Sequence, residues 1–306
     1  MIKTNRTILD QYIENFLEYL EIERSYSSKT IINYKHYLER FSAWCKQYHI
    51  NSPHNINLNQ INKYRVYLNR LDEKLKKKTQ NYHIIAIRAF LKYLSKKDVK
   101  SLSPEKIELG KEESREICFL EEDELEKLLS APDTSQIIGL RDRAILETLF
   151  STGLRVSELA KLDKNKVNLS RGEFSVIGKG GKARIVFLSK SAIFAIKKYL
   201  DVRSDNQQAL FVNHRKNCQS DNLRLTVRSV QRLIKNYAIQ AGIKKQVTPH
   251  VIRHTFGTDL LRSGADIRAV QKLLGHSSIT TTQIYTHVTD EHLRDVHKAF
   301  HGRRKK

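Results

Sequence analysis

The stretch TPHVIRHTFGTDLLRSG, residues 248–264, predicts a helix whose two ends are both marked in the sequence. Thr248 is a favourable N-cap residue, Pro249 suits the first helical position, and a glycine closes the segment. His250 and Arg253 are three residues apart, so they share one face of the first turns. A helix N-terminus offers free N–H groups and a positive dipole end, which together predict a phosphate-binding site.

Two other interpretations of this helix remain open from its residues alone. His254 follows His250 by four positions, which is the spacing of a zinc-ligand pair. However, no glutamate occupies the H-E-x-x-H position and no third ligand is evident, so a metal is not predicted. The plainest alternative is a capped helix with incidental histidines.

The chain around this helix is strongly basic. Its 306 residues include 55 Lys and Arg against 33 Asp and Glu, a net charge of +22. Such an excess predicts a polyanionic partner, because neutralising phosphates releases counterions; nucleic acid is the first candidate and an anionic membrane the second. The sequence shows neither a membrane span nor a signal peptide. Three widely spaced cysteines without a C-x-x-C pair favour a reducing cytoplasm.

Apolar periodicity divides the chain into two units and a linker. Residues 1–97 carry four helical patterns, the last on Tyr82, Ile85, Ala89 and Tyr93, and the tyrosines and Trp44 are expected in a core. Residues 98–118 are charged, lack periodicity and contain a proline and a glycine, which is typical of an interdomain linker. Residues 119–306 form a larger unit.

Within the larger unit, two β-rich runs flank the sequence GKGGK. EFSVI and ARIVFL predict an antiparallel hairpin whose tip carries Lys179 and Lys182. A phosphate-binding loop of the G-x-x-x-x-G-K-[ST] type is absent. Upstream, two helices are separated at Gly153, just before Arg155, and Glu158 is placed to hold the guanidinium. That arginine suits bidentate contact with a phosphate, although a surface Arg–Glu pair is the plainer alternative.

The segment LLGHSSITTTQIYTHV, residues 273–288, holds seven hydroxyl groups and two histidines. Gly275 closes the preceding helix and His276 follows it directly. The serines and threonines have ready explanations as helix caps. Tyr285 differs, because its phenol has a pKa near ~10 and so gives an accessible nucleophile. A phosphotyrosyl ester would also keep the energy of a phosphodiester bond for religation.

An ordered set of motifs in this chain resembles the tyrosine recombinases of the phage integrase family, with an Xer-like layout. The resemblance covers essentially the whole chain and fills every catalytic position: Arg155 in TGLRVSEL, Lys179 in GKGGKAR, His250 and Arg253 in HVIRH, His276 in LLGH and Tyr285 in YTHV. It implies a mainly α protein with a small antiparallel β-hairpin in the C-terminal domain. An N-terminal four-helix, SAM-like core-binding domain would precede the tyrosine-recombinase catalytic domain.

The resemblance also implies a chemistry that needs no metal ion or cofactor. Tyr285 would attack a DNA phosphorus, form a 3′-phosphotyrosyl link and release a 5′-hydroxyl. Arg155 and Arg253 would hold the non-bridging oxygens. Lys179 would protonate the leaving 5′-oxygen, His250 would assist proton transfer at the tyrosine, and His276 would donate a hydrogen bond to the phosphate.

The implied partner is double-stranded DNA, with a dimer on one site and a tetramer in the synapse that exchanges strands through a Holliday junction. A paralogous recombinase or a DNA translocase are further implied partners, and the location is the cytoplasmic nucleoid. Apolar residues of the last helical stretch, 292–306, are expected to dock on a neighbouring protomer or on their own domain. Chromosome-dimer resolution and mobile-element movement both fit. The alternatives are a type IB topoisomerase-like nicking-closing enzyme and a non-catalytic DNA-binding architectural protein.

Overall fold

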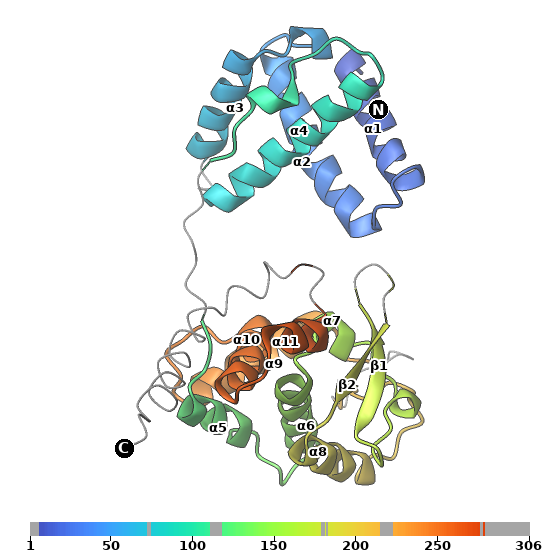
Figure 1. The fold of residues 1–306 in the computed structure, drawn as a ribbon, viewed down its shortest axis with the longest axis vertical. Helices are drawn as coiled ribbons and strands as arrows, with labels where there is room; N and C mark the ends of the chain where they lie inside the picture. Colours follow the sequence, from blue (N-terminus) through green and yellow to red (C-terminus); the bar gives the residue numbers. More distant parts are fainter. Residues whose placement is uncertain are drawn as a thin grey trace, which may run out of the picture. The chain divides into compact units, whose positions relative to one another are not determined.

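The computed structural model describes residues 6–71, 75–110, 118–178, 181, 183–214, 223–275 and 278. These residues belong to two compact units, Met1–Arg115 and Glu116–Lys306 (Figure 1). None of the described helices is both long and apolar enough to cross a membrane.

The first unit is helical, as expected. Reciprocal side-chain caps begin two of its described helices: Thr7 and Asp10 cap one, and Asn57 and Gln60 cap another. Its described α-helices are α1 (Ile8–Ile22), α2 (Ser28–Gln47), α3 (Leu58–Arg70) and α4 (Lys77–Lys96), with short 3₁₀ turns at Pro53–Asn55 and Pro104–Lys106.

The core of this unit is rich in aromatic side chains. Trp44 and Tyr64 are almost fully buried, which confirms the expected core role of Trp44, while Tyr82 is 42% exposed. The expected apolar stripe of α4 was therefore wrong at Tyr82 and Ile85, which are exposed, and right at Tyr93, which is buried in the core, with Ala89 packed against it. The buried face contains Ile84, Ile87 and their helical neighbours instead of Tyr82 and Ile85. Both stripes have helical spacing, and only contact with α1, α2 and α3 selects one of them.

Residues 99–110, assigned above to the linker, lie against the first unit. Ile107 is buried in its core, and Pro104–Lys106 packs on α4. Asn81 of α4 holds Gly110 by two backbone contacts: its Nδ2 donates to the carbonyl at 2.9 Å, and its Oδ1 accepts from the N–H at 3.1 Å. On the other side, Leu120 packs into the core of the second unit. Residues 111–117 lie outside the described residues.

The second unit is mainly helical with one small described sheet, which confirms the expected fold class. Strands β1 (Glu173–Ile177) and β2 (Ala183–Phe187) pair antiparallel, with Val176 opposite Arg184. The described α-helices are α5 (Glu122–Ser130), α6 (Ile137–Thr152), α7 (Val156–Leu159), α8 (Lys190–Asp201), α9 (Val227–Gln240), α10 (Pro249–Arg262) and α11 (Ile267–Leu274).

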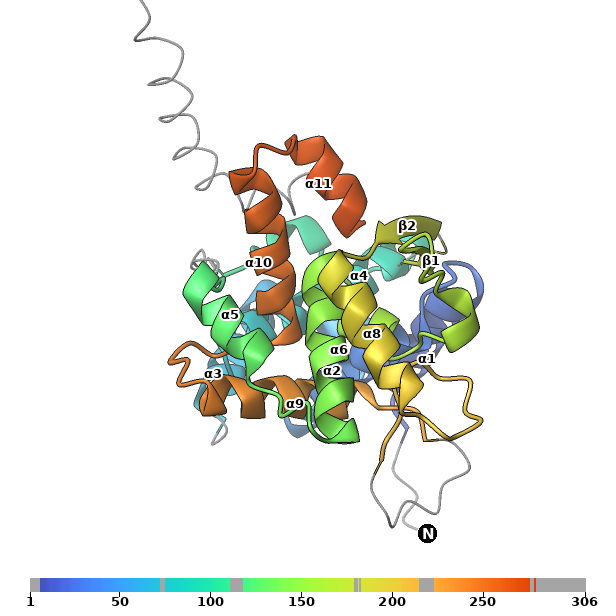
Figure 2. The same cartoon turned by 90° about the horizontal axis from the view of Figure 1, so that it is seen from below.

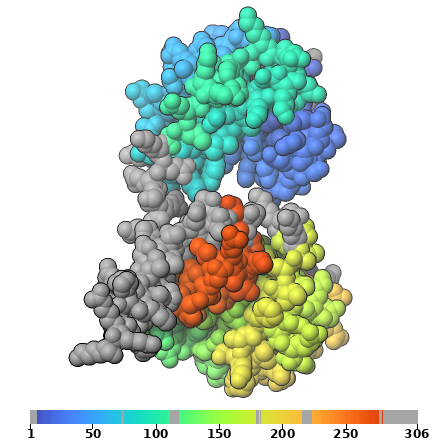
Figure 3. Space-filling model, viewed as in Figure 1, coloured from blue at the N-terminus to red at the C-terminus, as the bar shows by residue number. Residues whose placement is uncertain are grey.

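Helix α6 is the centre of this unit. It lies between α8 and α10 (Figure 2) and also packs on α5. Helix α11 follows α10 and borders β2, so the orange-red surface of the two helices adjoins the yellow-green surface of the hairpin (Figure 3). The ends of α6 and α11 and one strand of the hairpin are thereby brought to the same place.

Candidate active site

A tight turn after α6 places the first candidate residue. Gly153 adopts the left-handed conformation, with φ of 57°, and ends the helix. A Cβ at this position would lie 2.4 Å from Cδ1 of Phe256 in α10, so the turn packs against a second helix as well. Arg155 then serves as the N-cap of α7. The expected break between two helices at Gly153 is confirmed, and its glycine is required by conformation and by space.

Glu158 holds Arg155, as the spacing predicted. The backbone N–H of Arg155 donates to Oε2 of Glu158 at 2.8 Å, and Nη1 donates to Oε1 at 2.9 Å. The Nη2 atom of Arg155 donates to the carbonyl of Gly275 at 3.2 Å. Since the Arg155 side chain keeps 30% of its surface exposed, a ligand can still reach it.

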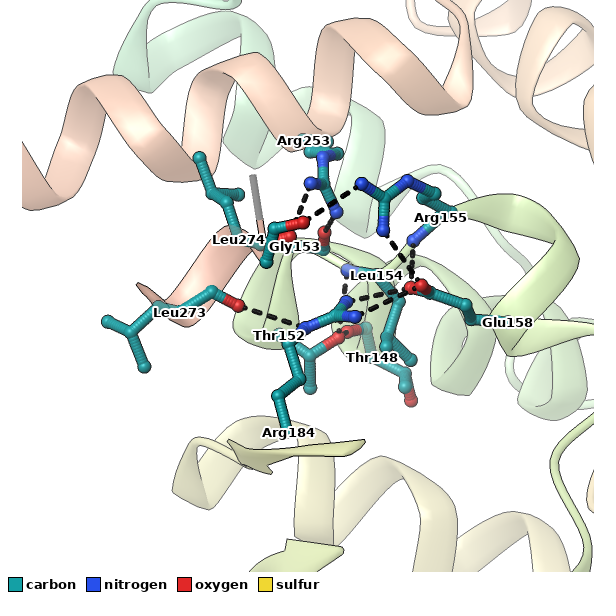
Figure 4. Close-up of polar contacts among 11 residues, drawn as sticks. Thr148, Thr152, Gly153, Leu154, Arg155, Glu158, Arg184, Arg253, Leu273 and Leu274 are labelled. Carbon is teal, nitrogen blue, oxygen red and sulfur yellow. Dashed lines mark hydrogen bonds and ion pairs between the residues drawn. The ribbon is translucent and has the colours of Figure 1, made fainter. Parts of the chain in front are cut away.

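Arg253 is buried within the same group of residues (Figure 4). Its Nη1 donates to the carbonyl of Gly153 and its Nη2 to the carbonyl of Leu274, each at 2.5 Å. Both carbonyls lie at helix C-termini, where backbone oxygens lack intrahelical partners and carry the negative end of the dipole. Arg253 and Arg155 therefore converge on the ends of α6 and α11, although 98 positions separate them in sequence.

His250 lies at the surface, one turn before Arg253 on α10. Thr248 caps this helix and Pro249 occupies its first turn, as predicted. Partial loss of hydration, together with the positive charges of Arg253 and Arg155, lowers the pKa of His250. Burial and the neighbouring His250 and Arg253 lower the pKa of His254 to about 4. A neutral His250 ring, able to accept a proton, is thus favoured at neutral pH.

Three of the predicted site residues, Lys179, His276 and Tyr285, lie outside the described residues. Their immediate neighbours in the chain are described: Gly178 follows β1, and Gly275 ends α11 with φ of 65°. The structure thus brings together Arg155, Arg253 and Gly275. As for the zinc alternative, the described parts of the chain contain no cluster of three or more His, Cys, Asp or Glu side chains suited to a metal.

Arg184 of β2 also belongs to this group, and the sequence analysis missed it. Its Nη1 and Nη2 donate to Oε1 and Oε2 of Glu158 at 3.0 and 2.7 Å (Figure 4). A signal was present in the strand pattern. Arg184 is in phase with the buried Val186, so alternation places a charged side chain on the inner face of the hairpin. An inward-facing arginine needs a partner, and Glu158 supplies it.

Glu158 is consequently shared by two guanidinium groups. Burial alone would raise the pKa of Glu158, but hydrogen bonds from Arg184 and Arg155 outweigh burial and hold the pKa below its usual value. The cluster thus contains three guanidinium groups and one carboxylate: Glu158 pairs with Arg155 and Arg184, and Arg253 bonds to backbone carbonyls. The excess of positive charge suits an anion with two oxygens for the guanidinium groups to bind, such as a phosphodiester.

Known protein families match both units of the chain. The model described as phage integrase family matches residues 118–292, and the one described as the phage integrase N-terminal SAM-like domain matches residues 13–98. The chain belongs to the phage integrase family. Tyrosine recombinase XerD of Listeria innocua is 38% identical over 304 residues, covering 96% of this chain and 100% of the relative. Tyrosine recombinase XerC of Bacillus subtilis is 36% identical, covering 95% and 96%.

Solved structures agree with this assignment. XerA recombinase is 33% identical, with a TM-score of 0.53 over 96% of this chain and all of that one. The XerH site-specific recombinase in a post-cleavage complex with palindromic difH substrate has a TM-score of 0.73, over 96% and 97% of the two chains. At 21% identity, the second likeness bears on the fold alone. The expected family and enzyme class, a tyrosine-type site-specific DNA recombinase, are confirmed.

Proposed function

We propose that this recombinase cuts and rejoins duplex DNA through a covalent bond to Tyr285. The observation that carries the proposal is the convergence of Arg155 and Arg253 on the ends of α6 and α11, with His250 one turn from Arg253. The two guanidinium groups bind the non-bridging oxygens of one phosphate and stabilise the charge that develops in the transition state.

Cleavage requires two proton transfers, one from the attacking phenol and one to the leaving 5′-oxygen. The phenolic oxygen of Tyr285 attacks phosphorus while His250, whose pKa is lowered, accepts the phenolic proton. The bond between phosphorus and the 5′-oxygen breaks, and Lys179 protonates that oxygen. The product is a 3′-phosphotyrosyl ester, held by a hydrogen bond from His276, and a free 5′-hydroxyl. Attack of a 5′-hydroxyl from the partner duplex reverses the step and joins new strands.

Strand exchange requires several copies of the chain on DNA. We propose a dimer on each site and a tetramer in the synapse, with Leu293, Val296 and Phe300 docking on a neighbouring protomer; these three lie outside the described residues. A cavity of about 620 Å³ in the second unit supports this arrangement, because its lining includes apolar side chains of α6, α10 and α11, among them Phe150, Phe256, Leu260 and Leu273.

The relatives are named tyrosine recombinases XerC and XerD, which supports strand exchange on DNA. We place this activity in the cytoplasm, with a paralogous recombinase or a translocase as a further partner. Chromosome-dimer resolution and movement of a mobile element use the same chemistry. A type IB topoisomerase-like enzyme would relax supercoils instead of exchanging strands, so recombinant products from two-site DNA separate the two activities.

Covalent trapping tests the proposal. Binding sites are selected from a random duplex library with the Tyr285→Phe protein, and nicked versions of those sites are incubated with wild type before denaturation. We expect a DNA-linked protein band from wild type and none from Tyr285→Phe. The control is Tyr48→Phe, which changes an exposed tyrosine far from Tyr285 in sequence and should give an undiminished band. Arg155→Gln should slow its appearance about 100- to 1000-fold. An equal band from Tyr285→Phe would rule out the nucleophile.

A further inference from the structure

Arg184 connects three segments of the site but has no part in the mechanism above. Besides its two bonds to Glu158, its Nε donates to the carbonyl of Leu273 at 3.2 Å (Figure 4). Its side chain is only 10% exposed. The same side chain packs against the C-cap residue of α11, since a Cβ on Gly275 would lie 2.9 Å from Cδ of Arg184. One buried guanidinium therefore joins β2, α7 and the end of α11.

Arg155 and Arg184 share the carboxylate of Glu158 unequally. The carboxylate accepts four: one from the backbone of Arg155, one from its guanidinium, and two from Arg184. A carboxylate has about four acceptor positions, so the group is saturated. Arg184 bonds to both oxygens, whereas the Arg155 guanidinium bonds to one. The side-chain interaction with Arg184 is thus the more extensive of the two.

The unequal sharing of Glu158 matters because the Arg155 guanidinium has to bind phosphate. If Glu158 faced Arg155 alone, the pair would be neutral and a phosphate would gain little from it. With Arg184 present, Glu158 and the two arginines carry a net charge of one, and Arg155 keeps positive charge to offer a ligand. The side chains of Glu158 and Arg184 are also largely shielded from water, which strengthens the interaction between them.

We propose that Arg184 is a positioning residue for DNA cleavage. It takes up the charge of Glu158, so that Arg155 stays oriented by that carboxylate without being neutralised by it. It also holds the backbone at Leu273 and Gly275, directly before His276, from a strand that begins four residues after Lys179. This proposal rests on the proposed function, because it deepens the role of the same site.

A purely structural salt bridge is the competing explanation, and charge balance distinguishes the two. Arg184→Gln lowers the summed charge of Arg155, Glu158 and Arg184 by one. Glu158→Gln in that background restores the original sum and leaves an amide oxygen that still accepts from Arg155. The positioning role therefore predicts that the second substitution rescues the first. Loss of a merely structural bridge predicts instead that the cleavage rate falls and recovers only together with the melting temperature, because Glu158→Gln then acts by removing a buried charge that lacks its partner.

The experiment measures the rate of covalent complex formation on nicked duplex at saturating DNA, together with the DNA dissociation constant. For Arg184→Gln we expect a rate about 10- to 100-fold below wild type. Its dissociation constant should change less than about threefold, because many other phosphate contacts support binding. The double variant with Glu158→Gln should recover at least about a third of that loss on a logarithmic scale.

The control is Arg171→Gln, which removes a mostly exposed arginine paired with Glu173 at the start of the same hairpin. It should cleave at the wild-type rate. If Arg184→Gln melts below the assay temperature, Arg184→Lys replaces it: a lysine keeps the charge but not the bidentate contact, and a rate between those of wild type and Arg155→Gln is expected.

The outcomes separate this proposal from the one it rests on. No covalent complex with wild type would overturn the proposed function itself. A covalent complex with wild type, combined with an unimpaired Arg184→Gln or with a double variant as slow as Arg184→Gln, would overturn the role of Arg184 and leave the recombinase chemistry intact.

Discussion

The chemistry of single residues depends on charges supplied by distant parts of the chain. His250 precedes Arg253 by one turn, so that contact follows from sequence spacing. Arg155 is the N-cap residue of α7, and only the fold places it near the imidazole. Loss of hydration and these two cations lower the pKa of His250, which favours the neutral ring that the proposed proton transfer requires.

The pKa of His250 should depend on the charge of Arg155. Replacing Arg155 by Gln removes a positive charge that disfavours the imidazolium, so the pKa of His250 should rise toward its usual value near ~6.5. Titration of the histidine ring signals by NMR checks this, with His250→Gln to assign the resonance. A substitution of Arg171, which is mostly exposed at the hairpin, should leave the pKa unchanged. An unshifted pKa in the Arg155 variant would show that the guanidinium does not act on His250.

At the scale of elements, the ends of helices build the site. Helices α6 and α11 both stop at glycines with positive φ, and their last carbonyls accept hydrogen bonds from arginines. Each arginine satisfies oxygens that a helix end leaves without intrahelical partners. The conformation of these glycines therefore determines where Arg155 and Arg253 meet.

Gly153→Ala should destabilise the second unit more than a glycine substitution that carries backbone strain alone. The left-handed conformation costs about 1–3 kcal/mol for a residue with a side chain. Contact between the new methyl group and the Phe256 ring adds a cost of similar size. Gly242→Ala is the matched control, since its φ is 68° and nothing lies within 4 Å of a Cβ there. Urea unfolding of both variants measures the difference; equal losses would exclude the Phe256 contact as a cause.

At the scale of the whole molecule, two compact units each bury their own core. Residues 99–110 pack on the first unit, although their charge and missing periodicity indicated a linker. Ile107 is buried in the core of that unit. Irregular backbone can pack as firmly as a helix when its apolar side chains and backbone groups find partners, as Asn81 provides for Gly110.

A fragment of residues 1–110 should therefore unfold at a higher temperature than a fragment of residues 1–97. The shorter fragment loses Ile107, whose burial contributes about 1.5–3 kcal/mol, and the two bonds between Asn81 and Gly110. Thermal unfolding of the two fragments, followed by circular dichroism in the helical band, measures the difference. Coincident melting curves would mean that residues 98–110 add no stability. Ile107→Ala in the longer fragment serves as an intermediate case.

The sequence by itself determined the local features of this protein. Caps, glycine stops and hairpin signals depend on neighbouring residues, so α10, α11, the break at Gly153 and the β1–β2 hairpin were all predictable. The ordered motifs were sufficient for the family, because the chain retains all six residue types in sequence order. The catalytic roles of all six residues remain predictions, and Lys179, His276 and Tyr285 also lie outside the described residues.

Tertiary structure alone decided which faces are buried and which partners meet. The buried side of α4, the attachment of Ile107 to the first unit and the bond between Arg184 and Glu158 all depend on residues far apart in sequence. Helical spacing and strand alternation identify a face without naming what will cover it. A charged side chain such as Arg184 acquires its function only when packing brings a carboxylate within reach, because the free energy of burying it depends on that partner.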